Sequence, residues 1–233
     1  MRKVVVFHGW ANATTPALDF IMRDFQSLIQ SPTIAVSFPQ SPFPVPADDY
    51  VAVCRRYRLM EESVIMHTRN NPHYTWWDWR PRPNDPPVAP GTYCYRGLED
   101  CVVPYLKEYF SMFGPFDAIV GFSQGALLAV ILATMAAAKR DGYECFATKG
   151  VCVVGPPSPV ESARHVELFR EHKVSAKSLV LLGDKDRIAA KRGHGIVTHF
   201  TGPLVVRYPG GHHFPRDEAT KKVFSSWLDK CTS

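Results

Sequence analysis

The sequence predicts an α/β fold in which a mostly parallel sheet has helices on both of its faces. Two patterns favour this class. Short apolar runs rich in valine, leucine and isoleucine recur without polar alternation, which is typical of strands buried on both faces. Segments with helical spacing of their apolar residues separate these runs. Because 233 residues suffice for one sizeable core, we predict a single domain over residues 1–233.

Six segments fit the parallel strands, and six others fit the covering helices. The predicted strands are residues 3–8, 33–38, 117–122, 149–155, 178–184 and 203–209. The predicted helices are residues 15–29, 98–113, 124–139, 161–172, 189–200 and 216–230. Thr15 can cap the first helix, and Pro16 suits its first turn. In such sheets, functional residues gather where the strands end.

A segment of different character interrupts this alternation at about residues 39–95. It holds ten of the 20 prolines, so regular elements are expected only around residues 48–67. It is also rich in tyrosine and tryptophan. We interpret it as a lid-like insertion above the sheet. Its aromatic side chains, Trp76 and Trp77 among them, would either line an apolar substrate pocket or pack the insertion itself.

The overall composition excludes several classes of protein. The net charge of +5 is modest and forms no long basic run, so no nucleic-acid partner is expected. The six cysteines lack metal-site spacing, and we expect buried thiols, no metal and no cofactor. The longest apolar run, residues 125–138, is about 14 residues long, which suits a core helix better than a membrane span. A cytoplasmic protein is therefore expected.

The stretch "GFSQG" places Ser123 between Gly121 and Gly125, at the junction of a predicted strand and a predicted helix. The pattern G-x-S-x-G is weak alone, but this context matches the sharp turn that exposes a nucleophilic serine. Glycines are needed there because side chains would clash where strand and helix approach closely. The alternative is a serine that merely caps the helix.

Partners for a nucleophilic serine follow in the order expected for this kind of site. A serine needs a base, and the base needs an orienting acid. Asp184 and Asp186 follow one predicted strand, and His212 and His213 follow the next. The glycine pair before His212 favours it as the base. Either aspartate is a candidate for the acid, and Asp186, two residues farther into the loop, can reach a histidine more easily.

An acyl-transfer site also needs two backbone N–H groups that face the developing oxyanion. Gln124, directly after the serine, would supply one of them. Trp10, in the loop after the first strand, would supply the other. His8 in the same loop is expected to have a structural role.

These segments resemble the family of serine hydrolases within the α/β-hydrolase fold. The matching pieces are "FHGW", "WWDW", "YRGLEDC", "GPFDAIVGFSQGA", "LLGDKD" and "YPGGHHFP", spread over nearly the whole chain. The resemblance implies an α/β-hydrolase fold with Ser123 as nucleophile, Asp186 as acid and His212 as base. It also implies hydrolysis of a small-molecule acyl ester.

Two alternatives remain from the sequence. One is an acyl-thioesterase that acts on coenzyme A esters or carrier-bound chains. The other is a protein that keeps the hydrolase fold and only binds a ligand.

Overall fold

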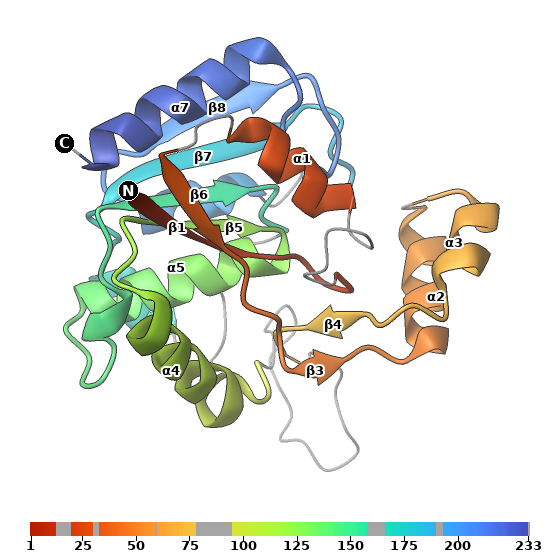
Figure 1. Cartoon of the computed structure of the whole chain (residues 1–233), viewed down its shortest axis with the longest axis horizontal. Coiled ribbons are helices and arrows are strands. Elements are labelled where there is room, and N and C mark those ends of the chain that lie inside the picture. The colour runs from red at the N-terminus through yellow and green to blue at the C-terminus, as the bar shows by residue number, and fades with distance from the viewer. Residues whose placement is uncertain are drawn as a thin grey trace.

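The centre of the molecule is a six-stranded, wholly parallel sheet in the order β2-β1-β5-β6-β7-β8 (Figure 1). The computed structural model describes residues 1–12, 20–29, 33–58, 60–77, 95–157, 166–189 and 193–232. The sheet strands are β1 (Arg2–Phe7), β2 (Ile34–Ser37), β5 (Ala118–Phe122), β6 (Gly150–Val154), β7 (Lys177–Gly183) and β8 (Leu204–Tyr208). All six predicted strands are present, and the α/β fold class is confirmed.

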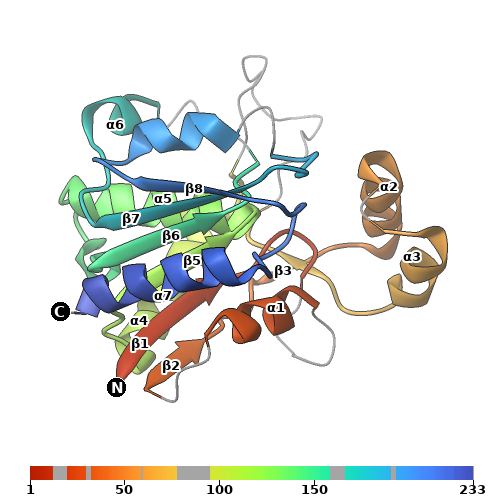
Figure 2. The same ribbon diagram turned by 90° about the horizontal axis from the view of Figure 1, so that it is seen from above.

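Helices cover both faces of this sheet (Figures 1 and 2). One face carries α1 (Phe20–Leu28) and α7 (Glu218–Thr232). The other carries α4 (Val103–Phe113), α5 (Gln124–Ala137) and α6 (Val166–Glu171). The alternation of strand side chains produces the two cores: Val4 and Val6 pack with α1 and α7, whereas Val5 and Phe7 pack with α4 and α5.

The helix α5 lies deepest in the structure. Almost all of its residues are buried, since it packs on β1, β5 and β6 with one face while other segments cover it. A helix that is apolar all round is expected in such a position. This explains why the long apolar run forms a core helix. Within the described residues, no helix has both the length and the apolarity needed to cross a bilayer.

Two predicted helices differ from the structure in their type, and the starts of two others cannot be compared with it. Residues 193–199 form a 3₁₀ helix, not the α-helix predicted over 189–200, because two glycines within three residues weaken α-helix formation there. The helix predicted over 98–113 opens with a π-helical turn, Leu98–Val102, before α4 begins. The predicted helix starts at 15 and 161 lie outside the described residues.

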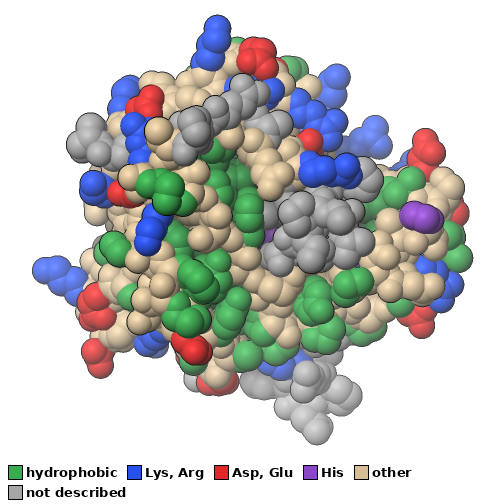
Figure 3. Space-filling model, in the orientation of Figure 1, with side chains coloured by type: hydrophobic (Ala, Val, Ile, Leu, Met, Phe, Trp, Pro, Cys, Tyr) green, Lys and Arg blue, Asp and Glu red, His purple; other side chains and the backbone are tan. Residues whose placement is uncertain are grey.

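The insertion forms a projecting arm beside the sheet (Figures 1 and 2). It contains a two-stranded antiparallel sheet of β3 (Phe43–Pro44) and β4 (Tyr74–Thr75), and between these strands the helices α2 (Ala47–Tyr57) and α3 (Glu62–Thr68). These helices fall where regular structure was expected. Figure 3 shows hydrophobic side chains on the arm next to charges of both signs. The rest of the insertion, residues 78–94, lies outside the described part.

The cysteines only partly match the expectation of buried thiols. Cys54, Cys152 and Cys231 are buried, but Cys101 and Cys145 are exposed on helical turns outside the core. Among the described residues, no group of three or more His, Cys, Asp or Glu side chains is arranged to hold a metal ion.

Candidate active site

Ser123 occupies a strained turn between β5 and α5. Its backbone angles are φ 52° and ψ −116°, a combination that residues other than glycine rarely adopt. The turn is possible because strand and helix approach closely: a Cβ on Gly121 would lie 2.6 Å from Cα of Ala126, and one on Gly125 would lie 2.5 Å from the His8 carbonyl oxygen. The turn places the Ser123 side chain at the amino end of α5, where developing negative charge is favoured.

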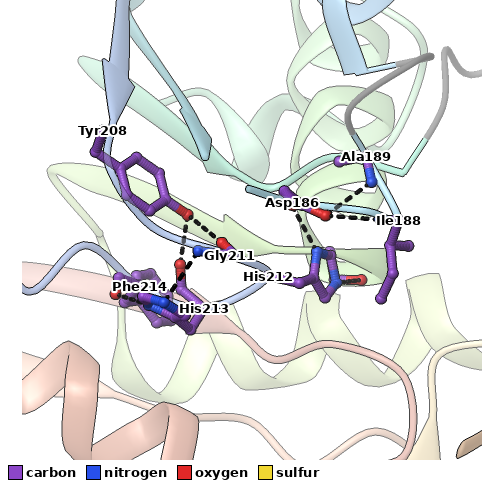
Figure 4. Close-up of polar contacts among 9 residues, drawn as sticks. Asp186, Ile188, Ala189, Tyr208, Gly211, His212, His213 and Phe214 are labelled. Carbon is purple, nitrogen blue, oxygen red and sulfur yellow. Dashed lines mark hydrogen bonds and ion pairs between the residues drawn. The ribbon is translucent and has the colours of Figure 1, made fainter. Parts of the chain in front are cut away.

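The imidazole of His212 contacts this serine directly. The distance from Oγ of Ser123 to Nε2 of His212 is 2.9 Å. On the other side of the ring, Nδ1 lies 2.8 Å from Oδ2 of Asp186 (Figure 4). An ionised carboxylate can only accept, so Nδ1 carries the ring proton and Nε2 is left as an acceptor for the serine hydroxyl. This is the tautomer that a general base needs.

Asp186 is held in its place by the backbone of its own loop. The carboxyl group is 1% exposed, and its Oδ1 accepts hydrogen bonds from the N–H groups of Ile188 and Ala189, both at 2.9 Å (Figure 4). Burial alone would raise the pKa of this carboxyl. The hydrogen bond and charge of His212, together with the two backbone donors, outweigh burial and leave its pKa below the ordinary value. Asp186 therefore remains ionised beside the imidazole.

The structure distinguishes Asp186 from Asp184 and His212 from His213. Asp184 lies at the surface, where its carboxylate pairs with Arg207 at 2.7 Å. His213 points away from the serine, and its ring bonds to the backbone of Gly211 and Phe214. Only Asp186 and His212 of these four lie in line with Ser123.

The three side chains meet because their strands are parallel. Ser123 follows β5, Asp186 follows β7 and His212 follows β8, so all three loops emerge at the same edge of the sheet. Gly155, whose φ is 53°, directly follows the intervening strand β6. A Cβ at this glycine would lie 3.1 Å from both Oδ2 of Asp186 and Nδ1 of His212, so its missing side chain leaves room for their contact.

The two residues expected to supply oxyanion donors lie at adjacent strand ends. Trp10 is in the loop after β1, which pairs directly with β5. Gln124 is the first residue of α5, where backbone N–H groups have no acceptor within the helix. Their assignment as oxyanion donors stays a prediction.

The side chain of Gln124 has a second connection that the sequence did not indicate. Its Oε1 accepts from the Thr75 hydroxyl at 2.9 Å and from the Trp76 backbone N–H at 3.0 Å, and its Nε2 donates to the Trp77 carbonyl at 3.4 Å. These bonds attach residues 75–77 of the insertion, which follow its two helices, to the start of α5.

The side chains of Trp76 and Trp77, two residues of this connection, are buried in the protein. They are 0% and 1% exposed and belong to the core on the α5 side of the sheet. The Trp76 indole donates to the His8 carbonyl at 2.8 Å, and Trp77 packs edge-on against Tyr95. This burial favours packing of the insertion, and substrate binding by the two indoles stays a prediction.

His8 supports the loop that carries Trp10. The ring is fully buried, with Nδ1 2.7 Å from the Gly9 carbonyl and Nε2 accepting from the Ser41 N–H at 3.2 Å. Desolvation lowers the pKa of this imidazole to about 4, although the Gly9 hydrogen bond acts in the opposite direction. His8 is thus a neutral structural histidine.

A family model described as "Serine hydrolase (FSH1)" matches residues 1–224, almost the whole chain. The chain belongs to this serine hydrolase family. The match includes the loops that carry Ser123, Asp186 and His212, so family membership and the observed geometry concern the same residues.

Relatives of this FSH1 family member include proteins named as esterases. Esterase OVCA2 of Xenopus tropicalis is 33% identical over 158 residues, which are 66% of this chain and 65% of that protein. Human Esterase OVCA2 is 26% identical, with 58% of each chain aligned. Family of serine hydrolases 2 of Saccharomyces cerevisiae is 28% identical over 58% of this chain and 62% of its own. The chain thus spans less than two thirds of the length of these relatives.

Solved structures share the fold of this FSH1 family member at low sequence identity. Esterase PE8 has a TM-score of 0.57 and 15% identity, with 99% of this chain and 92% of that chain covered. RedJ, a thioesterase from the prodiginine biosynthetic pathway of Streptomyces coelicolor, has a TM-score of 0.53 and 15% identity, with 98% and 85% covered. These likenesses establish the fold.

Several contacts of the site in this FSH1 family member could not be predicted from the sequence. The backbone donors to Asp186 and the side-chain bonds of Gln124 depend on loop conformations, which no spacing rule specifies. Tyr208 carries a weak signal, since it is the aromatic residue that ends β8 just before the glycine pair. Its hydroxyl contacts the backbone on both sides of His212.

Proposed function

We propose that this protein is a serine hydrolase that cleaves carboxylic esters through an acyl-enzyme. The observation that carries the proposal is the unbroken line of contacts from Ser123 through His212 to Asp186, at 2.9 Å and 2.8 Å. The membership in a serine hydrolase family and the relatives named as esterases support the same activity.

In the first step, Oγ of Ser123 attacks the carbonyl carbon of the ester while Nε2 of His212 takes the hydroxyl proton. Asp186 stabilises the imidazolium that results, through the bond at Nδ1. The tetrahedral intermediate then expels the alcohol, which receives the proton from Nε2. A water molecule repeats the sequence on the acyl-enzyme, so that the acid is released and Ser123 regains its proton.

Two backbone N–H groups would stabilise the oxyanion of each tetrahedral intermediate. The groups of Trp10 and Gln124 are suited by their positions at the ends of β1 and β5, the strand that leads to the nucleophile. The chemistry uses only these side chains, the two donors and water.

The direct test is replacement of the nucleophile. Ser123→Ala is expected to lower hydrolysis of p-nitrophenyl acetate and butyrate by at least about 10³-fold, and to abolish labelling by a fluorophosphonate probe. Ser225→Ala, at an exposed serine on α7, serves as the control and should behave as the native protein. Probe labelling of the Ser123→Ala variant at another residue would refute the assignment, and an unlabelled native protein would favour a binding protein without catalysis.

The substrate class requires a separate comparison. An oxygen ester and a thioester with the same acyl chain should be compared, over chain lengths from acetyl to palmitoyl. We expect a higher kcat/KM for the oxygen esters. A clear preference for the thioesters would keep the mechanism and identify the protein as an acyl-thioesterase.

A further inference from the structure

His212 lies in a short loop that contains two glycines. The hydroxyl group of a buried tyrosine, Tyr208, contacts the backbone of this loop. Tyr208, the last residue of β8, is 1% exposed. Its hydroxyl lies 2.5 Å from the carbonyl oxygen of His213 and 3.1 Å from that of Gly211, the residues on either side of His212 (Figure 4). One side chain therefore contacts both peptide groups that flank the proposed base.

The neighbouring imidazole of His213 also bonds to the backbone of this loop. Its Nε2 accepts from the Gly211 N–H at 3.1 Å, and its Nδ1 lies 2.7 Å from the Phe214 carbonyl oxygen (Figure 4). An oxygen of a carbonyl can only accept, so Nδ1 carries the proton of this ring. His213 thus bonds to one residue on each side of the pair of histidines.

The loop that contains His212 packs directly against the loop that contains Asp186. The Lys185 N–H donates to the Gly210 carbonyl at 2.8 Å, and the Asp184 N–H donates to the Tyr208 carbonyl at 2.9 Å. A Cβ at Gly183 would lie 2.6 Å from the Gly211 carbonyl oxygen, which shows how closely the two loops pack. The positions of the proposed acid and base are therefore coupled through the backbone.

We infer that Tyr208 and His213 are positioning residues, which together fix the His212 imidazole between Ser123 and Asp186. The inference rests on the proposed function. Two glycines give the loop many accessible conformations, and the transfer of a proton requires one of them. Burial raises the pKa of the Tyr208 hydroxyl, with the charges of Asp186 and Asp217 acting in the same direction, so this group remains a donor throughout the working pH range.

The main test removes a single oxygen atom. Tyr208→Phe keeps the ring packed and deletes only the donor. We expect kcat to fall roughly 10-fold to 100-fold with KM nearly unchanged, because a displaced base slows the chemical step and leaves substrate binding intact. Tyr143→Phe is the matched control, since Tyr143 is also buried but precedes β6, at the opposite edge of the sheet. Its kcat should equal that of the native protein.

A second pair of variants tests the imidazole of His213. The side-chain oxygen of glutamine in His213→Gln can accept from the Gly211 N–H, whereas leucine in His213→Leu cannot. We expect His213→Gln to retain most of the native kcat and His213→Leu to lose it to a similar extent as Tyr208→Phe. All variants are assayed well below their melting temperatures, so that lowered stability does not mimic slower chemistry.

A spectroscopic readout makes the test independent of turnover. The Nδ1 proton of His212, bonded to a carboxylate, should give a low-field proton NMR signal that disappears in His212→Gln. This signal should weaken or shift in Tyr208→Phe and remain in Tyr143→Phe. Native kcat together with an unchanged signal in Tyr208→Phe would overturn the inference. A native protein that does not hydrolyse esters would instead overturn the proposed function, and an altered signal would still establish the positioning of His212.

Discussion

Residue 125 lies where the helix α5 comes closest to strand β1. A methyl group there would be placed 2.5 Å from the His8 carbonyl oxygen and against the Phe7 carbonyl oxygen. The Phe7 oxygen belongs to strand β1, and the His8 oxygen accepts the hydrogen bond of the buried Trp76 indole, so a shift of either would disturb a buried contact. We therefore expect Gly125→Ala to lower the free energy of unfolding by about 3 kcal/mol or more, measured by urea denaturation.

Gly202→Ala provides the control for this substitution. Gly202 has a φ of 60°, and no atom lies within 4 Å of a Cβ placed there. Only backbone strain of about 1–2 kcal/mol should result. Equal losses in the two variants would contradict a steric role for Gly125.

The two neighbouring aspartates provide a second contrast between single residues. Asp186→Asn removes the charge that orients His212, and it should lower kcat by about 10³-fold or more with little change in KM. Asp184→Asn removes only a surface ion pair with Arg207, so kcat should stay within about 2-fold of the native value. Hydrolysis of p-nitrophenyl butyrate measures both. If Asp184→Asn were the more damaging change, the acid would have to be reassigned.

Residue types alone predict part of this site. The glycines around Ser123 and the order of serine, acid and base indicate which loops meet, since parallel strands deliver their ends to one edge. The sequence favours Asp186 over Asp184 only by its longer reach into the loop, because it does not reveal the direction of either side chain. The backbone hydrogen bonds to the Asp186 carboxylate decide that direction, and they form only in the folded loop.

The elements of the sheet were more predictable than those outside it. All six continuous apolar runs became strands. The expected burial on both faces holds for β1, β5, β6 and β7, whereas the edge strand β2 is half-buried and the edge strand β8 is largely exposed. The 3₁₀ helix at residues 193–199 and the π-helical turn before α4 keep apolar residues buried, so their pattern resembles that of an α-helix. The hydrogen-bonding pattern of a short helical segment depends on its neighbours, which periodicity does not reveal.

The connection between the insertion and α5 depends on one amide side chain. Gln124→Met keeps the length of the side chain but leaves the buried Trp76 N–H without its acceptor and removes the donor to Trp77. We expect a loss of about 2–3 kcal/mol in the free energy of unfolding. Thr75→Val removes a single hydroxyl donor to the same oxygen and should cost only about 1 kcal/mol.

Chemical denaturation of both variants tests this order. The catalytic rate is a useful second measurement, because Gln124→Met keeps the backbone N–H that is proposed to bind the oxyanion. A stability loss in Gln124→Met no larger than that in Thr75→Val would mean that the amide does not hold the insertion in place.

At the scale of the whole molecule, the site joins segments that are distant in the chain. His8 shows this coupling, since its ring contacts Gly9 and Ser41 while its carbonyl oxygen accepts from Trp76. This one buried residue, through its ring and its carbonyl oxygen, thus connects the loops after β1 and β2 with the insertion. Its protonation would place a charge in the interior without a compensating partner, so the stability of the whole fold should respond to pH.

The direction of this response follows from the pKa of His8. The folded value is about 4, below the ordinary value of 6.5 expected in the unfolded chain. Between these values the unfolded chain binds the additional proton, so the free energy of unfolding decreases as pH falls from 6.5 towards 4. Asp186, whose pKa is lowered, contributes stability that is lost only at still lower pH.

We expect His8 to account for about 2–3 kcal/mol of the stability lost between pH 7 and pH 4.5. His8→Asn cannot titrate there, so its free energy of unfolding should change less over this interval, even though the variant is less stable at pH 7. His67→Asn, at an exposed histidine of α3, should retain the native pH dependence. Urea denaturation at both pH values measures these differences, and an equally steep acid response in His8→Asn would show that the buried imidazole does not limit acid stability.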